Sequence, residues 1–196
     1  MALYTKDNCK IQDDYKTPIK IWRDIMDYIP KDKKIWAPFY YKGDHTLKEL
    51  GFDIIHQEED FFKVDRGEIV VDNPPFSIKK QVLERLVKLD KPFILIMPAS
   101  TLCYKYARII KDKIQIIIPN GRVKYLDNGK SPSFDSLYYC YKMNLPKDII
   151  YLEDTNPPKV KKPRKPRTKK IVKKIVNKYN IPICKTFDKP PKNINN

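Results

Sequence analysis

Asn73-Pro74-Pro75-Phe76 combines an amide, two prolines and an aromatic ring directly after a short apolar run at residues 68–71. The apolar run predicts a buried strand, and a helical pattern follows the motif. The prolines fix φ near about −65° and lack backbone donors, so the turn is stiff. Such a turn can hold the Asn73 amide and the Pro74 carbonyl as two acceptors beside the Phe76 ring. This suits a flat base with an exocyclic amino group, although Asn-Pro and Pro-Pro also occur in ordinary turns.

The elements that would position this motif are strands and helices that alternate along the chain. The apolar patterns predict strands at 34–39, 52–56, 68–71, 93–97, 114–118 and 136–143, a short strand at 122–126, and helices at 17–29, 46–50, 78–89 and from Ser100 or Thr101 to about Ile110. Thr17 is expected to cap the first helix, with Pro18 at its first position, and Gly51 to end the second. This order predicts an α/β fold with a doubly wound, mostly parallel, Rossmann-like sheet and an antiparallel C-terminal part.

Polar residues follow three of the predicted strands, at 40–44, 58–60 and 72–76. In doubly wound sheets the ligand site lies outside the carboxyl ends of the strands. The sequence therefore predicts that these three segments line one crevice.

The net charge of +16 is concentrated at the C-terminal end of the 196-residue chain. Residues 159–192 contain 14 Lys and Arg against one acid, which leaves only +3 for the rest. This change predicts an N-terminal arm at 1–14, a folded domain at 15–156, and an extended, disordered basic tail at 157–196. A basic tail of this kind favours nucleic acid, with nuclear targeting or an anionic membrane surface as alternatives.

The four cysteines are scattered, and none forms a Cys-x-x-Cys pair. The sequence thus predicts neither a zinc site nor a disulfide framework, and a reducing, intracellular compartment. There is no run of about 18 apolar residues and no apolar signal-peptide core at 1–7, so no membrane-spanning segment is expected. Cys103 and Cys140 are expected in the core, His56 packed in a strand, and His45 on the surface.

Over residues 13–145 the order of these features resembles that of the amino-type DNA methyltransferases, specifically the small N6-adenine enzymes of phages and large DNA viruses. Asn73-Pro74-Pro75-Phe76 matches the family's (Asp/Asn)-Pro-Pro-(Tyr/Phe) motif, and residues 121–125 and 133–136 resemble its C-terminal signature. The resemblance implies S-adenosylmethionine as cofactor and an adenine flipped out of the duplex. The N6 amino group of that adenine would donate hydrogen bonds to the Asn73 side chain and the Pro74 carbonyl, with Phe76 stacked on the base. A viral protein of this kind would act in the cytoplasm or nucleus of the infected host.

The resemblance also implies a set of residues that bind the cofactor. They are Tyr15, Thr17 and Pro18 at the first helix, Pro38, Phe39, Tyr41 and Gly43 in the cofactor-binding loop, Glu58 at the ribose of the cofactor, and Asp60 and Phe61 at the adenine of the cofactor. In the resembled family, the cofactor-binding loop opens with an acid at the position of Ala37 and has a glycine at the position of Tyr41. A methyltransferase fold with weak or no activity that binds nucleic acid is therefore the alternative function.

DNA is the expected partner, with RNA or protein methylation by the same motif left open, and no metal is expected. The residues expected to contact nucleic acid are Arg122 and Lys124 in the domain, and Lys161, Lys162, Arg164, Lys165, Arg167, Lys169 and Lys170 in the tail.

Overall fold

The computed structural model describes residues 17–39, 45–125 and 133–153. The chain divides into two units after Glu153, and only the first falls within this range. The predicted N-terminal arm, Tyr15, Tyr41, Gly43 and the tail lysines and arginines lie outside the described residues, so the predictions for them stay predictions.

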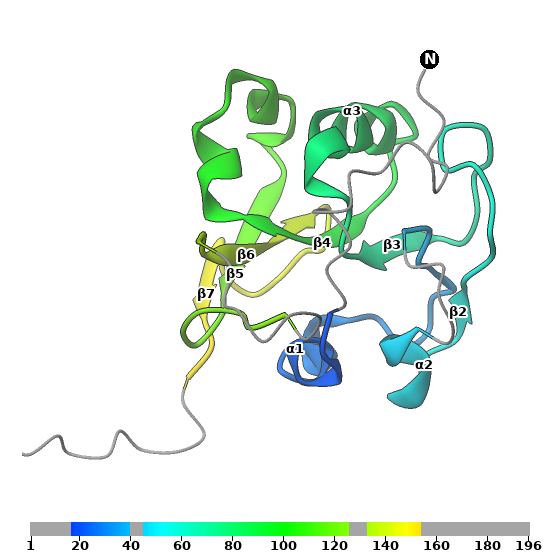
Figure 1. The fold of residues 1–196 in the computed structure, drawn as a ribbon, viewed down its shortest axis with the longest axis horizontal. Helices are drawn as coiled ribbons and strands as arrows, with labels where there is room; N and C mark the ends of the chain where they lie inside the picture. Colours follow the sequence, from blue (N-terminus) through cyan, green and yellow to red (C-terminus); the bar gives the residue numbers. More distant parts are fainter. Residues whose placement is uncertain (1–16, 40–44, 126–132, 154–196) are drawn as a thin grey trace, which may run out of the picture. The chain divides into compact units, whose positions relative to one another are not determined.

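Seven strands of the described chain form one mixed sheet in the order β2-β1-β3-β4-β6-β5-β7 (Figure 1). They are β1 (Ile35–Trp36), β2 (Ile54–Ile55), β3 (Ile69–Asp72), β4 (Phe93–Pro98), β5 (Ile114–Ile118), β6 (Ser136–Tyr141) and β7 (Ile149–Tyr151). The strands β1 to β4 pair in parallel, and β6 is antiparallel to both β4 and β5. The predicted α/β class is confirmed, including the antiparallel C-terminal part.

Helices cover both faces of this sheet. They are α1 (Ile19–Arg23), α2 (Thr46–Glu49) and α3 (Lys79–Lys88), with 3₁₀ segments η2 (Met26–Tyr28), η3 (Phe76–Ile78), η4 (Ala99–Cys103) and η5 (Lys105–Ile110). Figure 1 shows α3 on one side of the sheet and α1 and α2 on the other. Side chains alternate accordingly along β3, where Ile69 and Val71 join the core under α1 and α2 while Val70 joins the core under α3. The sheet is thus doubly wound, as predicted.

The predicted helix at 17–29 is wrong in extent, because it stops after Arg23 and resumes only as η2. A tertiary hydrogen bond explains the break. The Tyr138 hydroxyl donates to the Ile21 carbonyl at 2.7 Å, and the amide of Ile25 turns instead to Trp22 at 3.2 Å. Pro18 occupies the cap position, and Thr17 makes no side-chain cap, so that prediction is also wrong.

Other elements differ from the sequence prediction for local reasons. The first strand ends at Trp36, just before the proline at 38, and the helix predicted up to Ile110 is two 3₁₀ segments joined by an extended Tyr104. Residues 122–125 form no strand. Side-chain hydrogen bonds join them to residues 135–136 in place of backbone pairing between strands. The edge strand β7 was not predicted, because three residues give too short a pattern. The stop at Gly51 is confirmed, with φ of 84°.

Gly67, which leads into β3, generates a prediction about stability. Its φ is +56°, and a Cβ added there would lie 2.7 Å from the Lys34 carbonyl oxygen and 3.1 Å from the Trp36 nitrogen. Gly67→Ala should therefore lower the free energy of unfolding by more than the roughly 1–3 kcal/mol of backbone strain alone. Gly51→Ala is the matched control, since its φ is also positive but no atom lies within 4 Å of the added Cβ.

Urea unfolding of the two variants and the wild type measures this difference. An equal loss of stability in both variants would contradict the close packing of Gly67 against β1.

Candidate functional site

The motif begins where β3 ends, in the middle of the parallel part of the sheet. β3 lies between β1 and β4, and all four of its residues are buried. Asn73 is half-buried, Pro74 and Pro75 are buried, and η3 starts at Phe76. The motif therefore sits at the carboxyl edge of the sheet, as the sequence predicts.

The last residue of β3, Asp72, connects the motif to its surroundings. Its side chain is 1% exposed. One carboxylate oxygen accepts from the backbone nitrogen of Phe39 at 2.7 Å, and the other accepts from that of Asn73 at 2.7 Å. The second oxygen also lies 3.3 Å from His45 Nε2. A single carboxylate thus binds the loop after β1, the start of α2 and the motif.

The ring of His45 has a defined tautomer in this arrangement. Its Nδ1 accepts a hydrogen bond from the Leu47 nitrogen at 3.2 Å, so that atom carries no proton. Nε2 then carries the proton, and this N–H donates a hydrogen bond to the Asp72 carboxylate. His45 is 3% exposed, so its predicted surface position is wrong. Asp72 lies in the segment 72–76 predicted to line the crevice, but no role was predicted for its side chain, although an acid that closes an otherwise apolar buried strand is a signal for one.

The ring of His45 also lies near side chains of α1 and of the segment after β2. Its ring centroid lies 6.2 Å from that of Trp22 in α1 and 5.4 Å from that of His56 after β2. His56 Nδ1 is 2.6 Å from the Ala37 carbonyl oxygen. Ala37, which stands where the resembled family has an acid, is completely buried.

The loop after β2 packs against the loop after β1. The ring of Phe61 is completely buried, with its centroid 4.7 Å from that of Phe39 and 5.3 Å from that of Trp36. From α3, Arg85 donates to the carbonyls of Phe61 and Val64 at 2.8 and 2.9 Å. Phe39 thus contacts both Phe61 and the residue before the motif. Residues 40–44 lie outside the described part of the chain, so the crevice of three segments stays a prediction.

Two buried polar atoms of the predicted cofactor-binding residues bear on whether the chain fits S-adenosylmethionine. Within the described residues, the Thr17 hydroxyl and Asp60 Oδ2 are buried without a hydrogen-bond partner, although Oδ2 lies 3.5 Å from Lys63 Nζ. The other oxygen of Asp60 accepts from the Phe62 nitrogen at 2.9 Å. A buried acceptor and a buried hydroxyl are the kinds of group that a nucleoside amino group and an amino acid can bind. The residues present therefore fit the cofactor that the resemblance implies.

The remaining residues predicted for the cofactor differ in exposure. Pro38 and Phe39 are buried, Pro18 is half-buried and Glu58 is exposed. Because the rings of Phe39 and Phe61 are enclosed in the core, they can shape the wall of a site but offer little surface for stacking.

Phe76 is also largely covered. Its ring is 8% exposed and meets the ring of Phe134 edge-on, with centroids 5.3 Å apart. The next residue, Asp135, accepts at its carbonyl from the Ala99 nitrogen at 2.8 Å and pairs through its side chain with Arg122 at 2.9 Å. Residues 133–136 thus lie beside the motif, and both Arg122 and Lys124 are exposed.

Three titratable groups of β6 lie in the buried core, and burial shifts their pKa values upward. Burial raises the pKa of Tyr138 and of Tyr139, and it raises the pKa of Cys140 to about 12. Cys140 is in the core as predicted, whereas Cys103 is exposed and its predicted core position is wrong.

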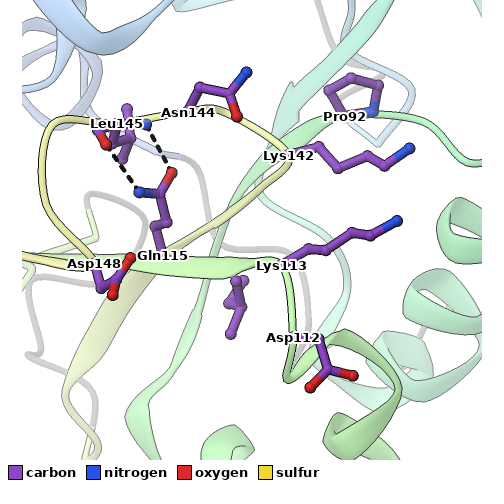
Figure 2. Close-up of a pocket in the computed structure, with 9 residues that line it drawn as sticks. Pro92, Asp112, Lys113, Gln115, Lys142, Asn144, Leu145 and Asp148 are labelled. Carbon is purple, nitrogen blue, oxygen red and sulfur yellow. Dashed lines mark hydrogen bonds between the residues drawn. The ribbon is translucent and has the colours of Figure 1, made fainter.

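A separate cavity of about 770 Å³ lies at the amino ends of β4, β5 and β7 (Figure 2). Its lining includes Pro92 before β4, Lys113 before β5 and Asp148 before β7, which are parallel strands. On one side of the cavity Gln115 exchanges hydrogen bonds with the backbone of Leu145 at 3.0 and 2.7 Å. This cavity is therefore distinct from the edge that carries the motif.

Part of this chain is similar to a methyltransferase. The type II methyltransferase M.EcoRI of Escherichia coli is 37% identical over 98 residues, and the match covers 43% of this chain. The chain spans 30% of the length of that protein. No family model matches the chain.

A distant likeness exists among solved structures. A dimethyladenosine transferase from Plasmodium falciparum superposes with a TM-score of 0.46 and 14% identity, over 65% of this chain and 62% of that one. A likeness at this level carries no conclusion about function.

Membrane-spanning helices and metal-binding clusters are both absent from the part of the chain that the structure describes. No helix there is long and apolar enough to cross a membrane. No group of three or more His, Cys, Asp and Glu side chains there could hold a metal ion.

The contacts of Asp72 predict how the edge responds to its loss. Asp72→Ala leaves one buried and one partly buried backbone donor without this acceptor, at about 1–3 kcal/mol each, so the free energy of unfolding should fall by roughly 2–6 kcal/mol. Asp72→Asn should cost less, because the amide keeps one acceptor oxygen. Chemical denaturation measures both changes.

Asp53→Asn is the control for this series, since the Asp53 side chain is 70% exposed and pairs with Lys34 on the surface. Its effect should stay within about 1 kcal/mol. If Asp72→Ala were no more harmful than Asp53→Asn, the buried carboxylate would not hold the edge together.

Proposed function

We propose that this chain transfers a methyl group from S-adenosylmethionine to the N6 amino group of adenine in DNA. The observation that carries the proposal is the position of Asn73-Pro74-Pro75-Phe76 at the end of β3, tied through Asp72 to the loop after β1. The partial similarity to a methyltransferase supports it.

The proposed work of the motif is to orient and activate a weak nucleophile. The lone pair of an adenine amino group is delocalised into the ring. Two acceptors, the Asn73 side-chain oxygen and the Pro74 carbonyl, would accept hydrogen bonds from its two N–H groups. These bonds would direct the lone pair toward the reacting methyl group. Fixed acceptors cost no reorganisation during the reaction, and positioning of this kind lowers the barrier. When bound, S-adenosylmethionine would supply an activated methyl group, with the N6–C bond forming as the S–C bond breaks, S-adenosylhomocysteine leaving and one N6 proton passing to water.

The cofactor would lie against the residues that Asp72 joins to the motif. Phe39 and Phe61 form its wall, while Asp60 and Thr17 offer buried polar atoms toward it. Arg85 keeps the loop that carries Asp60 in place. The base would reach Phe76 by replacing the edge contact of Phe134.

A nucleic-acid-binding protein without transfer is the second candidate function. The observation that favours it is Ala37, which is completely buried and whose carbonyl is occupied by His56, so this position offers no acid to the cofactor's ammonium group. Calorimetric titration with S-adenosylmethionine separates the two functions, since the second predicts no binding at millimolar ligand.

Asn73 provides the direct test of the first function. The wild type should incorporate label from S-adenosylmethionine into N6-methyladenine in A/T-rich duplex DNA. Asn73→Ala should reduce the rate by about 100-fold or more, the typical cost of a removed transition-state hydrogen bond. Asn73→Asp is the matched variant, because the resembled motif admits Asp, and it should retain more activity than Asn73→Ala.

Nucleoside analysis after digestion identifies the product. Label in RNA or in protein would move the acceptor to the alternatives left open above, and equal rates for wild type and Asn73→Ala would refute a role for the motif.

The basic tail gives a second test that concerns the partner. Deletion of residues 157–196 should leave the thermal unfolding of the domain unchanged and weaken binding to DNA. The slope of log affinity against log salt should become shallower, by about 0.9 for each phosphate that the tail neutralises in the full-length protein. Loss of folding on truncation, or an unchanged salt slope, would contradict a tail that binds phosphates.

A further inference from the structure

The chain that follows β4 exposes large side chains close to the motif. η4 and η5 meet at Tyr104, whose backbone is extended with φ of −81° and ψ of 141°. Tyr104 is 48% exposed and Leu102 in η4 is 46% exposed. Neighbouring exposed side chains of this size are a common feature of binding surfaces.

Tyr104 is held on a fixed support. Its ring stacks on that of Tyr106, with centroids 5.3 Å apart and planes 10° from parallel. The Tyr106 hydroxyl oxygen is buried, and this burial raises the pKa of the phenol. η5 packs against α3, and Ala107 and Ile110 of η5 are buried. The exposed ring therefore rests on a part of the core and is preorganised.

A cation connects this ring to the motif. Lys79 Nζ donates to the Phe76 carbonyl at 2.9 Å and lies 5.5 Å from the centroid of the Tyr104 ring. Exposed basic residues continue along both elements, at Lys80 in α3 and at Lys105 and Arg108 in η5. An exposed aromatic ring beside a cation is the combination with which proteins bind single-stranded nucleic acid, by stacking on a base and attracting the backbone.

We propose that Tyr104, Leu102 and Lys79 form a contact surface for the nucleotides that flank the target adenine. The inference rests on the proposed function, because an adenine held at Asn73 would bring its own strand to this side of the motif. Tyr104 stacks on a neighbouring base, Leu102 covers its edge, and Lys79 moves from the Phe76 carbonyl to a phosphate. Stacking is tolerant of sequence, so this surface would add affinity without fixing a recognition site.

The test uses the full chain and single-stranded oligonucleotides in which 5-iodouracil stands beside an adenine. Irradiation should cross-link the iodouracil to Tyr104, as mapped by mass spectrometry. Fluorescence anisotropy should show roughly a tenfold loss of affinity in Tyr104→Ala, at a salt concentration that suppresses the tail contribution. Tyr104→Phe should keep the affinity, because the ring remains.

Two matched variants control for general effects. Tyr151→Ala removes a tyrosine that is 70% exposed on the edge strand β7, and it should not change the affinity. Lys79→Ala should weaken binding more than Lys80→Ala, since Lys80 lies 3.8 Å from Glu84 and points along its own helix.

The outcomes separate this inference from the proposed function. Methyl transfer by the wild type together with unchanged affinity in Tyr104→Ala, and no cross-link at Tyr104, would overturn the inference alone. A cross-link at Tyr104 with the predicted loss of affinity, but no methyl transfer to any nucleic acid, would support the contact surface and overturn the proposed function.

Discussion

The buried carboxylate of Asp72 is the interaction on which the candidate site depends. It replaces the water that an ionised group would otherwise need with hydrogen bonds from Phe39, Asn73 and His45. Burying such a group is costly unless it is bonded in this way, and once it is bonded the partners are held in place. The two loops that must act together, one after β1 and one after β3, are thereby fixed to the same carboxylate group. The motif's rigidity thus comes from its surroundings as well as from its own prolines.

The aromatic and cationic contacts around this carboxylate extend the same constraint outward. The rings of Trp22 and His56 both lie near that of His45, and Arg85 of α3 fixes the neighbouring loop from the opposite face of the sheet. Each of these side chains comes from a different segment, so the edge is assembled by the whole doubly wound core. A methyl-transfer site benefits from this, because it works through position and fixed dipoles.

Much of the fold was predictable from the sequence because its strongest patterns are local. The apolar run of β4, the helical spacing of α3 and the stop at Gly51 each depend on residues close together in the chain. The break in the first helix was not predictable, since it depends on a hydroxyl from Tyr138, 117 residues along the chain from Ile21. The extended backbone at Tyr104 likewise has no local signal.

The same distinction applies to the candidate site. Asn73-Pro74-Pro75-Phe76 identifies itself by its residue types, but Asp72 and His45 acquire their roles only when β3 and α2 meet, 27 residues apart. The central claim is that the Asp72 carboxylate positions the motif for methyl transfer. Its most direct test is the single-turnover rate of transfer from labelled S-adenosylmethionine to DNA by Asp72→Asn, measured well below the variant's unfolding temperature. We predict a rate roughly 10- to 100-fold below that of the wild type, because small displacements of reacting groups have effects of this size. A rate equal to the wild type's, or no transfer by the wild type itself, would contradict the account.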